Sequence, residues 1–163
     1  GGSQAEARAA IARGEQLFNA REFTVAGVGG FNDFFFGQPI KGTCTSCHET
    51  PGVGTQSFAG LFDTGVSDGA RRTADLPLYT FREKSSGKLF ETTDPGQALV
   101  TGKWAQMNRF KIPALRALAA RAPYFHNGHA GTLEEVVSFY NDRFKLALTP
   151  RESADLAAFL RSL

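Results

Sequence analysis

Apolar residues recur at helical spacing near the start of the chain. From residue 4 to 19 they lie three or four positions apart, with the stripe formed by Ile11, Gly14, Leu17 and Phe18. This spacing predicts an amphipathic helix. Ser3 precedes the stretch and Glu6 follows three residues later, a pattern typical of a capping box at a helix start. We therefore expect a helix over residues 4–19 that buries one face.

Two more amphipathic helices are expected near the C-terminus. Thr132 with Glu135 forms a second capping box, and Thr149 with Glu152 resembles a third, with Pro150 at a first helical position. The apolar stripes that follow are Leu133, Val136, Val137 and Tyr140 in one helix, and Leu156, Phe159, Leu160 and Leu163 in the other. Because the first and last helices each have one apolar face, we expect them to pack against each other.

The sequence between these helices is mostly aperiodic. Residues 20–43 are rich in glycine and aromatic residues and predict a long loop, with Phe34–Phe36 packing inward or, in the alternative, forming an exposed binding patch. Residues 51–103 are dense in turn-forming residues; a stretch of that kind is often functional. Within it, "LPLYTFREKSSGKLFETT" predicts a hairpin with "SSGK" as its turn. A further helix is expected to begin near Pro113 and to end at Pro123.

Composition narrows the class of protein. The 163 residues carry a formal charge of +2, which gives no reason to expect a nucleic-acid partner. The chain has no apolar run of 18 residues, so we expect no membrane span. Glycine (18) and phenylalanine (15) are frequent, which indicates loops packed around a bulky apolar group. We expect one domain over residues 1–163.

Both cysteines lie in the motif Cys44-Thr45-Ser46-Cys47-His48. A thioredoxin-like redox pair would need a βαβ context, which the sequence does not predict. A structural zinc would need four ligands at short spacings, and His126 and His129 are some eighty residues away. The C-x-x-C-H pattern is that of c-type haem attachment, with two thiols bound to the haem and the adjacent imidazole ligating the iron. We therefore predict one covalently bound haem c with His48 as proximal ligand.

The second axial position decides between electron transfer and catalysis. By sequence alone the candidates are Met107, His126, His129 and Tyr140. Each also has a structural interpretation, as a core thioether, a turn histidine or a hydrogen-bonded buried phenol. The residues themselves leave this choice open.

Residues 106–142 resemble the C-terminal haem domain of the bacterial dihaem cytochrome c peroxidase and MauG family. The resemblance rests on three segments: "RFKIPALR", "APYFHNGH" and "GTLEEVV". It extends to "ARGEQLFN" and to residues 44–48 and is weak over residues 50–100. It implies an all-α, cytochrome c-like fold around one haem, with long Gly- and Phe-rich loops.

The resemblance also implies roles for individual residues. The family places the second iron ligand at the position of Tyr140, as methionine in peroxidases and tyrosine in MauG-like members, so Tyr140 is favoured over Met107. Haem contacts are expected from Trp104, Phe110, Pro113, Arg116, Tyr124 and His126. Arg109, Lys111 and Arg116 could neutralise haem propionates or dock a partner, and are otherwise solvated charges. The family's calcium site uses positions matching Arg121 and Pro123 together with a ligand from a domain that this sequence lacks, so calcium is not expected.

Three functions follow as hypotheses. The first is a monohaem cytochrome that passes single electrons to a redox partner protein. The second is a peroxidase- or MauG-like enzyme with a weak or open sixth position, in which His126 acts as acid–base. The third is a haem-based sensor or a detached oxidoreductase subunit. Haem c attachment implies a periplasmic location, and because the start "GGSQAEARAA" lacks signal-peptide features, we expect an exported chain whose leader has been removed.

Overall fold

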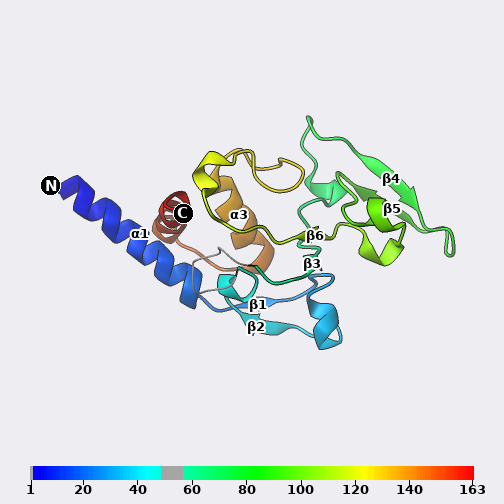
Figure 1. The fold of residues 1–163 in the computed structure, drawn as a ribbon, viewed down its shortest axis with the longest axis horizontal. Helices are drawn as coiled ribbons and strands as arrows, with labels where there is room; N and C mark the ends of the chain where they lie inside the picture. Colours follow the sequence, from blue (N-terminus) through cyan, green and yellow to red (C-terminus); the bar gives the residue numbers. More distant parts are fainter. Residues whose placement is uncertain (1, 49–56) are drawn as a thin grey trace.

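The structure, a computed structural model, describes residues 2–48 and 57–163. It contains the helices α1 (Gly2–Ala20), α2 (Ala98–Thr101), α3 (Leu133–Phe144) and α4 (Pro150–Arg161). Short strands form three antiparallel pairs: β1 (Phe23–Val25) with β2 (Ile40–Gly42), β3 (Leu61–Phe62) with β6 (Phe110–Lys111), and β4 (Tyr79–Arg82) with β5 (Leu89–Thr92). The expectation of an all-α fold is therefore too simple, because β1, β2 and β3 lie in segments that we interpreted as loops, and further strands pair elsewhere in the described part of the chain (Figure 1).

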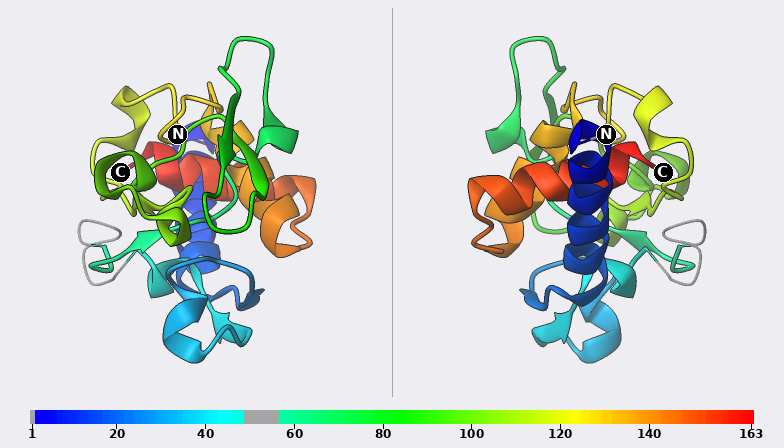
Figure 2. Two further views of the ribbon diagram at one scale, coloured as in Figure 1. Left: turned by 90° about the vertical axis from the view of Figure 1, so that its right-hand side faces the viewer. Right: turned by 90° about the vertical axis from the view of Figure 1, so that its left-hand side faces the viewer.

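The first and last helices pack as their apolar faces predict. α1 crosses α4 at a steep angle, and the N-terminal half of α1 extends away from the body (Figures 1 and 2). The crossing is close because Gly14 lies against the backbone of Asp155, where a Cβ atom would be only 2.7 Å from the carbonyl carbon. Phe18 packs on Phe159 with ring centroids 5.5 Å apart. Arg13 donates hydrogen bonds of 2.7 and 2.9 Å to the two carboxylate oxygens of Asp155.

The capping boxes give a mixed result. Thr132 with Glu135 starts α3, and Thr149 with Glu152 starts α4, with Pro150 in the first turn. Both predictions are confirmed. The capping box at Ser3 is wrong, because α1 already includes Gly2 and Ser3 lies inside the helix.

The predicted helix between Pro113 and Pro123 is wrong. Only the 3₁₀ turn Leu118–Ala120 forms there, and Ala117 has a left-handed backbone with φ of 54°. The backbone groups of this segment find distant partners instead. The Ala117 amide donates to the Leu163 carbonyl at 2.9 Å, and the Pro113 carbonyl accepts from His48 at 3.2 Å. A regular helix would withdraw these groups from those contacts.

The aromatic run at Phe34–Phe36 does not pack inward. Phe36 is 96% exposed and Phe34 63%, while the preceding Phe31 is 4% exposed and supplies the inward contact. The run lies on a short 3₁₀ turn, Asn32–Phe35, followed by Phe36 in a left-handed conformation. Consecutive residues of such a turn face different directions, so they cannot all reach the core. The predicted hairpin, in contrast, is confirmed as β4–β5, with the Gly87 amide donating to the Glu83 carbonyl at 2.8 Å.

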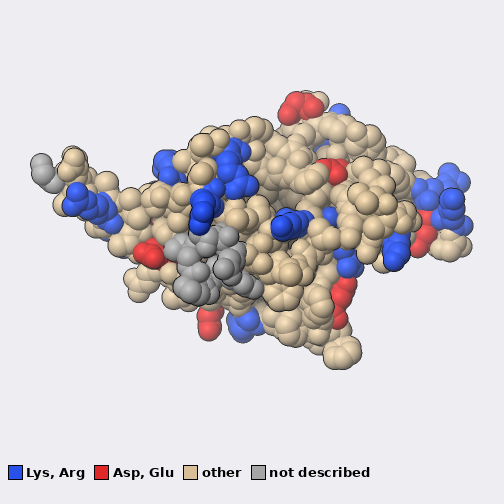
Figure 3. All heavy atoms as spheres, viewed as in Figure 1, with Lys and Arg blue, Asp and Glu red and all other residues tan. Residues whose placement is uncertain are grey.

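Charges are mixed over the face drawn in Figure 3. Lys and Arg side chains gather beside acidic ones at the end formed by the β4–β5 hairpin, and much of the remaining face is uncharged. None of the helices in the described part of the chain combines the length and the hydropathy that a membrane span requires.

Candidate haem site

The C-x-x-C-H motif lies on a tight turn that follows β2. Cys44–Ser46 form one 3₁₀ turn, which is capped by reciprocal hydrogen bonds between Thr43 and Ser46. The His48 amide then donates to the Cys44 carbonyl at 2.9 Å. This turn presents both thiols and the imidazole to one cavity, and all three side chains line it.

The two thiols are not joined in a disulfide, and both cysteines are half-buried. Burial raises the pKa of Cys44 to about 12 and that of Cys47 to about 11. Both groups are therefore protonated at neutral pH. A catalytic dithiol would need a lowered pKa, so this environment argues against thiol–disulfide exchange chemistry.

His48 is held with one nitrogen toward the cavity. Its Nδ1 donates to the Pro113 carbonyl at 3.2 Å. Burial lowers the pKa of His48 to about 4, although the hydrogen bond to Pro113 partly opposes this shift. The ring is therefore neutral at pH 7, and its Nε2 atom can serve as a metal ligand. A backbone acceptor on the far nitrogen is the usual support for a metal-binding histidine.

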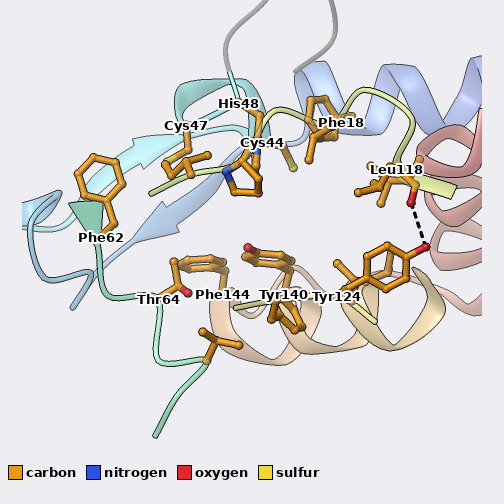
Figure 4. A pocket seen from close by; sticks show the side chains of 18 of the residues that line it. Phe18, Cys44, Cys47, His48, Phe62, Thr64, Leu118, Tyr124, Tyr140 and Phe144 are labelled. Atoms are coloured by element: carbon orange, nitrogen blue, oxygen red, sulfur yellow. Dashed lines mark hydrogen bonds between the residues drawn. The ribbon is translucent and has the colours of Figure 1, made fainter. Parts of the chain in front are cut away.

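The cavity has a volume of about 400 Å³ and its walls are mainly apolar. Figure 4 shows a flat slot between the Cys44–His48 segment on one side and α3 on the other, with Phe62 near one end and Leu118 near the other. Pockets for small molecules and cofactors have this size and apolar character. The residues that line it include Phe18, Val25, Val28, Phe62, Ile112, Leu115, Leu118, Val136, Val137, Phe144, Leu156 and Leu160.

Tyr140 faces His48 from the opposite wall. The Tyr140 side chain reaches from α3 into the slot, and its ring lies along the wall opposite the His48 imidazole (Figure 4). Burial raises the pKa of Tyr140. Its ring stacks on Phe144, one helical turn further on, with an angle of 8° between the planes. In the described part of the chain, the Tyr140 hydroxyl has no hydrogen-bond partner, whereas the Tyr124 hydroxyl donates to the Leu118 carbonyl at 3.2 Å.

These residues fit a c-type haem. The slot is apolar, as the porphyrin requires, and the two thiols and the imidazole of the attachment motif lie on the same wall. Histidine and tyrosine are both known haem ligands, and the Tyr140 phenol, without a hydrogen-bond partner in the described ranges, lies on the wall opposite the imidazole. The cavity therefore offers attachment points and two facing donor atoms for one haem.

The structure brings only some of the predicted contact residues to this cavity. Phe110, Pro113, Tyr124 and His126 line it. Among the described residues, Met107, Trp104 and Arg116 do not belong to its lining. Trp104 packs on Phe90 instead, with ring centroids 5.9 Å apart. His129 also lies outside the lining, and its buried Nδ1 has no partner in the described part of the chain.

Two features of the site escaped the sequence interpretation. Phe144 could have been found, because it lies four positions after Tyr140 on the same helical face. Asp94 could not, because it pairs with His126 from 32 residues away in an aperiodic segment.

Comparisons with known proteins agree with the fit to haem. No protein-family model matches the chain. Cytochrome-c peroxidase IdrP2 of Denitromonas iodatirespirans is 33% identical over 136 residues, which cover 76% of this chain and 36% of that protein. The cytochrome c551 peroxidase of Nitrosomonas europaea is 33% identical over 129 residues, covering 76% of this chain and 31% of that protein. The methylamine utilization protein MauG of Paracoccus denitrificans is 28% identical over 135 residues, which cover 80% of this chain and 30% of that protein.

A solved structure supports the fold. The crystal structure of a MauG-like protein associated with microbial copper homeostasis superposes with a TM-score of 0.59 at 24% identity, over 94% of this chain and 43% of that one. This chain spans about a third of the length of the curated relatives it matches. These relatives are haem proteins of the peroxidase and MauG type. The chain is therefore related to the family of bacterial dihaem cytochrome c peroxidases and MauG.

Proposed function

We propose that this chain is a c-type haem domain of a peroxidase- or MauG-like redox protein. One haem would be held through Cys44 and Cys47, and His48 and Tyr140 would bind its iron. The observation that carries the proposal is that the imidazole and the phenol, which has no hydrogen-bond partner among the described residues, lie on opposite walls of an apolar slot. When bound, a haem supplies one-electron and peroxide chemistry.

The protein's own groups would set how that chemistry proceeds. Pro113 fixes the His48 ring, so the same nitrogen always faces the cavity. The apolar walls exclude water, and Phe144 restricts the Tyr140 ring by stacking on it. A phenolate favours higher oxidation states of iron than a thioether does, which suits peroxidase- or MauG-like chemistry better than simple electron carriage. Because c-type haem is attached outside the cytoplasm, the proposal includes a periplasmic location.

Single-electron transfer is the second candidate function. It is favoured by the two facing donors themselves, because an iron held on both sides has no vacant position for peroxide. In that case the domain would pass electrons to or from a redox partner protein. Steady-state turnover of the unaltered protein with hydrogen peroxide separates the candidates. Rapid turnover supports the enzyme, and its absence in a correctly loaded protein supports the carrier.

The ligand assignment is tested by a matched pair of tyrosine variants. The haem-loaded Tyr140→Phe protein should show altered ferric optical and electron paramagnetic resonance spectra, because it loses an iron ligand. Tyr124→Phe removes an equivalent hydroxyl from the same cavity lining, but this hydroxyl already has a partner in the Leu118 carbonyl. The Tyr124→Phe spectra should therefore be unchanged. If the Tyr140→Phe spectra match those of the unaltered protein, Tyr140 is not a ligand. A spectral change in Met107→Leu would assign that role to Met107.

A further inference from the structure

His126 lies at the rim of the cavity and is paired with a carboxylate. Its ring lines the cavity beside Phe110, with ring centroids 4.5 Å apart. The Nδ1 atom is hydrogen-bonded to Oδ2 of Asp94, and the pair is partly exposed, with the His126 side chain 61% accessible and that of Asp94 18%. Because a carboxylate occupies Nδ1, Nε2 is the nitrogen left to meet whatever fills the cavity.

Asp94 is held firmly by its own surroundings. Its Oδ1 accepts from the Gly96 amide at 2.9 Å, and its amide donates to the Thr92 hydroxyl at 3.1 Å. Thr92 is fully buried and lies 2.6 Å from Oδ1 of Asn108. The carboxylate therefore projects from a rigid polar network rather than from a free loop.

The turn that carries His126 is anchored independently. The Tyr124 amide donates to the Ala130 carbonyl at 2.7 Å, which closes the turn. Asn127 then ties it to the neighbouring segment by donating to the Val66 carbonyl at 3.2 Å and to the Thr93 hydroxyl at 3.0 Å. With both partners fixed, the Asp94–His126 pair is preorganised, which is the arrangement by which a carboxylate orients a histidine.

The charged residues that line the cavity indicate which kind of group the His126 imidazole would contact. Lys111 and Arg121 also line the cavity, and no aspartate or glutamate does so among the described lining residues. A rim with two cations and one imidazole suits an anionic oxygen. Two sources share this chemistry: a carboxylate side arm of the haem, and a small anion that enters from solvent.

We propose that Asp94 is a positioning residue that orients His126, so that Nε2 of His126 hydrogen-bonds an anionic oxygen of the cavity's occupant. This inference rests on the haem-binding function proposed above and adds a residue that acts through His126. The inference predicts the direction in which the midpoint potential of Asp94→Asn changes. Removing a donor from an anionic oxygen near the iron favours the ferric state, so Asp94→Asn should lower the midpoint potential. A direct charge effect has the opposite sign, because loss of a negative charge favours the ferrous state.

The experiment measures the midpoint potential and the ferric azide affinity of the haem-loaded protein. Asp94→Asn and His126→Gln should each change either the equilibrium constant for haem reduction or the azide dissociation constant roughly tenfold. This is the size of the effect expected from one charge-assisted hydrogen bond. The double variant should shift no further than His126→Gln alone. A change in the potential identifies the haem carboxylate as the source, and a change confined to azide identifies a small anion.

The chain offers a matched control for each variant. The Asp68 carboxylate accepts from the amide two residues later at 3.0 Å, as that of Asp94 does, but it contacts no histidine among the described residues. His129 lies on the same turn as His126, outside the cavity lining. Asp68→Asn and His129→Gln should leave both measurements unchanged.

Three results would overturn the inference. The first is a raised potential in Asp94→Asn, and the second is an Asp94→Asn effect that persists undiminished in the His126→Gln background. The third is a His126→Gln protein that matches the unaltered one in both measurements, which decides the matter even if Asp94→Asn does not fold. Failure of the proposed function is recognised separately, by the absence of attached haem or by unchanged Tyr140→Phe spectra.

Discussion

The crossing of α1 and α4 makes Gly14 a sensitive position. In Gly14→Ala the new methyl group would lie 2.6 Å from Cβ of Phe159 and 2.7 Å from the carbonyl carbon of Asp155. Carbon atoms in favourable contact are about 3.5–4.0 Å apart, so the two helices must separate by roughly 1 Å. The obstructing atoms belong to backbone or to a Cβ, so a side-chain rotation cannot relieve the overlap.

The expected cost follows from two opposing terms. Overpacking a close contact costs about 1–3 kcal/mol, and replacing glycine by alanine inside a helix recovers about 1 kcal/mol. We therefore expect a net loss of up to about 2 kcal/mol in the free energy of unfolding. For a chain of this size, that corresponds to a fall of up to roughly 4–8 °C in Tm.

Thermal and urea unfolding of the haem-loaded protein measure this change. Gly2→Ala is the matched control, since it lies in the same helix and a Cβ there has no neighbour within 4 Å. It should not be destabilised. The Soret band of Gly14→Ala should also shift or broaden, because Phe18 on α1 lines the cavity and lies 6.2 Å from the His48 ring. A Gly14→Ala protein that is more stable than the unaltered one by the full helix-propensity gain of about 1 kcal/mol would refute the close-crossing argument.

Three further predictions concern stability. Arg13 lowers the pKa of Asp155 by its hydrogen bonds, so the pair stabilises the fold at pH values above the usual aspartate pKa, and this contribution is lost as the pH falls through the lowered folded-state pKa. The free energy of unfolding should therefore fall less steeply with decreasing pH in Asp155→Asn than in the unaltered protein. An unchanged slope would contradict the pairing. Phe36→Ser, at a 96% exposed site, should change the free energy of unfolding by less than about 0.5 kcal/mol. Phe31→Ser, at a buried site, should lower it by about 3–5 kcal/mol. Equal losses for the two variants in urea unfolding would show that Phe36 is packed. Thr132→Ala should cost about 1 kcal/mol through loss of the α3 cap, and no measurable loss by the same assay would show that the cap is dispensable.

The sequence predicted best where local rules decide the structure. The caps at Thr132 and Thr149 depend on residues three positions apart, and the β4–β5 hairpin on a turn that contains Gly87. The attachment motif is also local, so the placement of His48 on a tight turn beside two thiols needed no knowledge of the fold. Helix pairing followed from two apolar faces that each required a partner.

It predicted poorly where distant groups replace local hydrogen bonds. The Pro113–Pro123 segment has helical composition, but its backbone serves His48 at one end and Leu163 further along, so it stays irregular. The Asp94–His126 pair is of the same kind, since no periodicity relates its two members. Both segments lie at the cavity. There the chain encloses a space for a bulky apolar group and does not fill the core with its own side chains. A fold built around such a group has fewer self-contained elements, and its non-local contacts therefore identify the site better than its periodic ones.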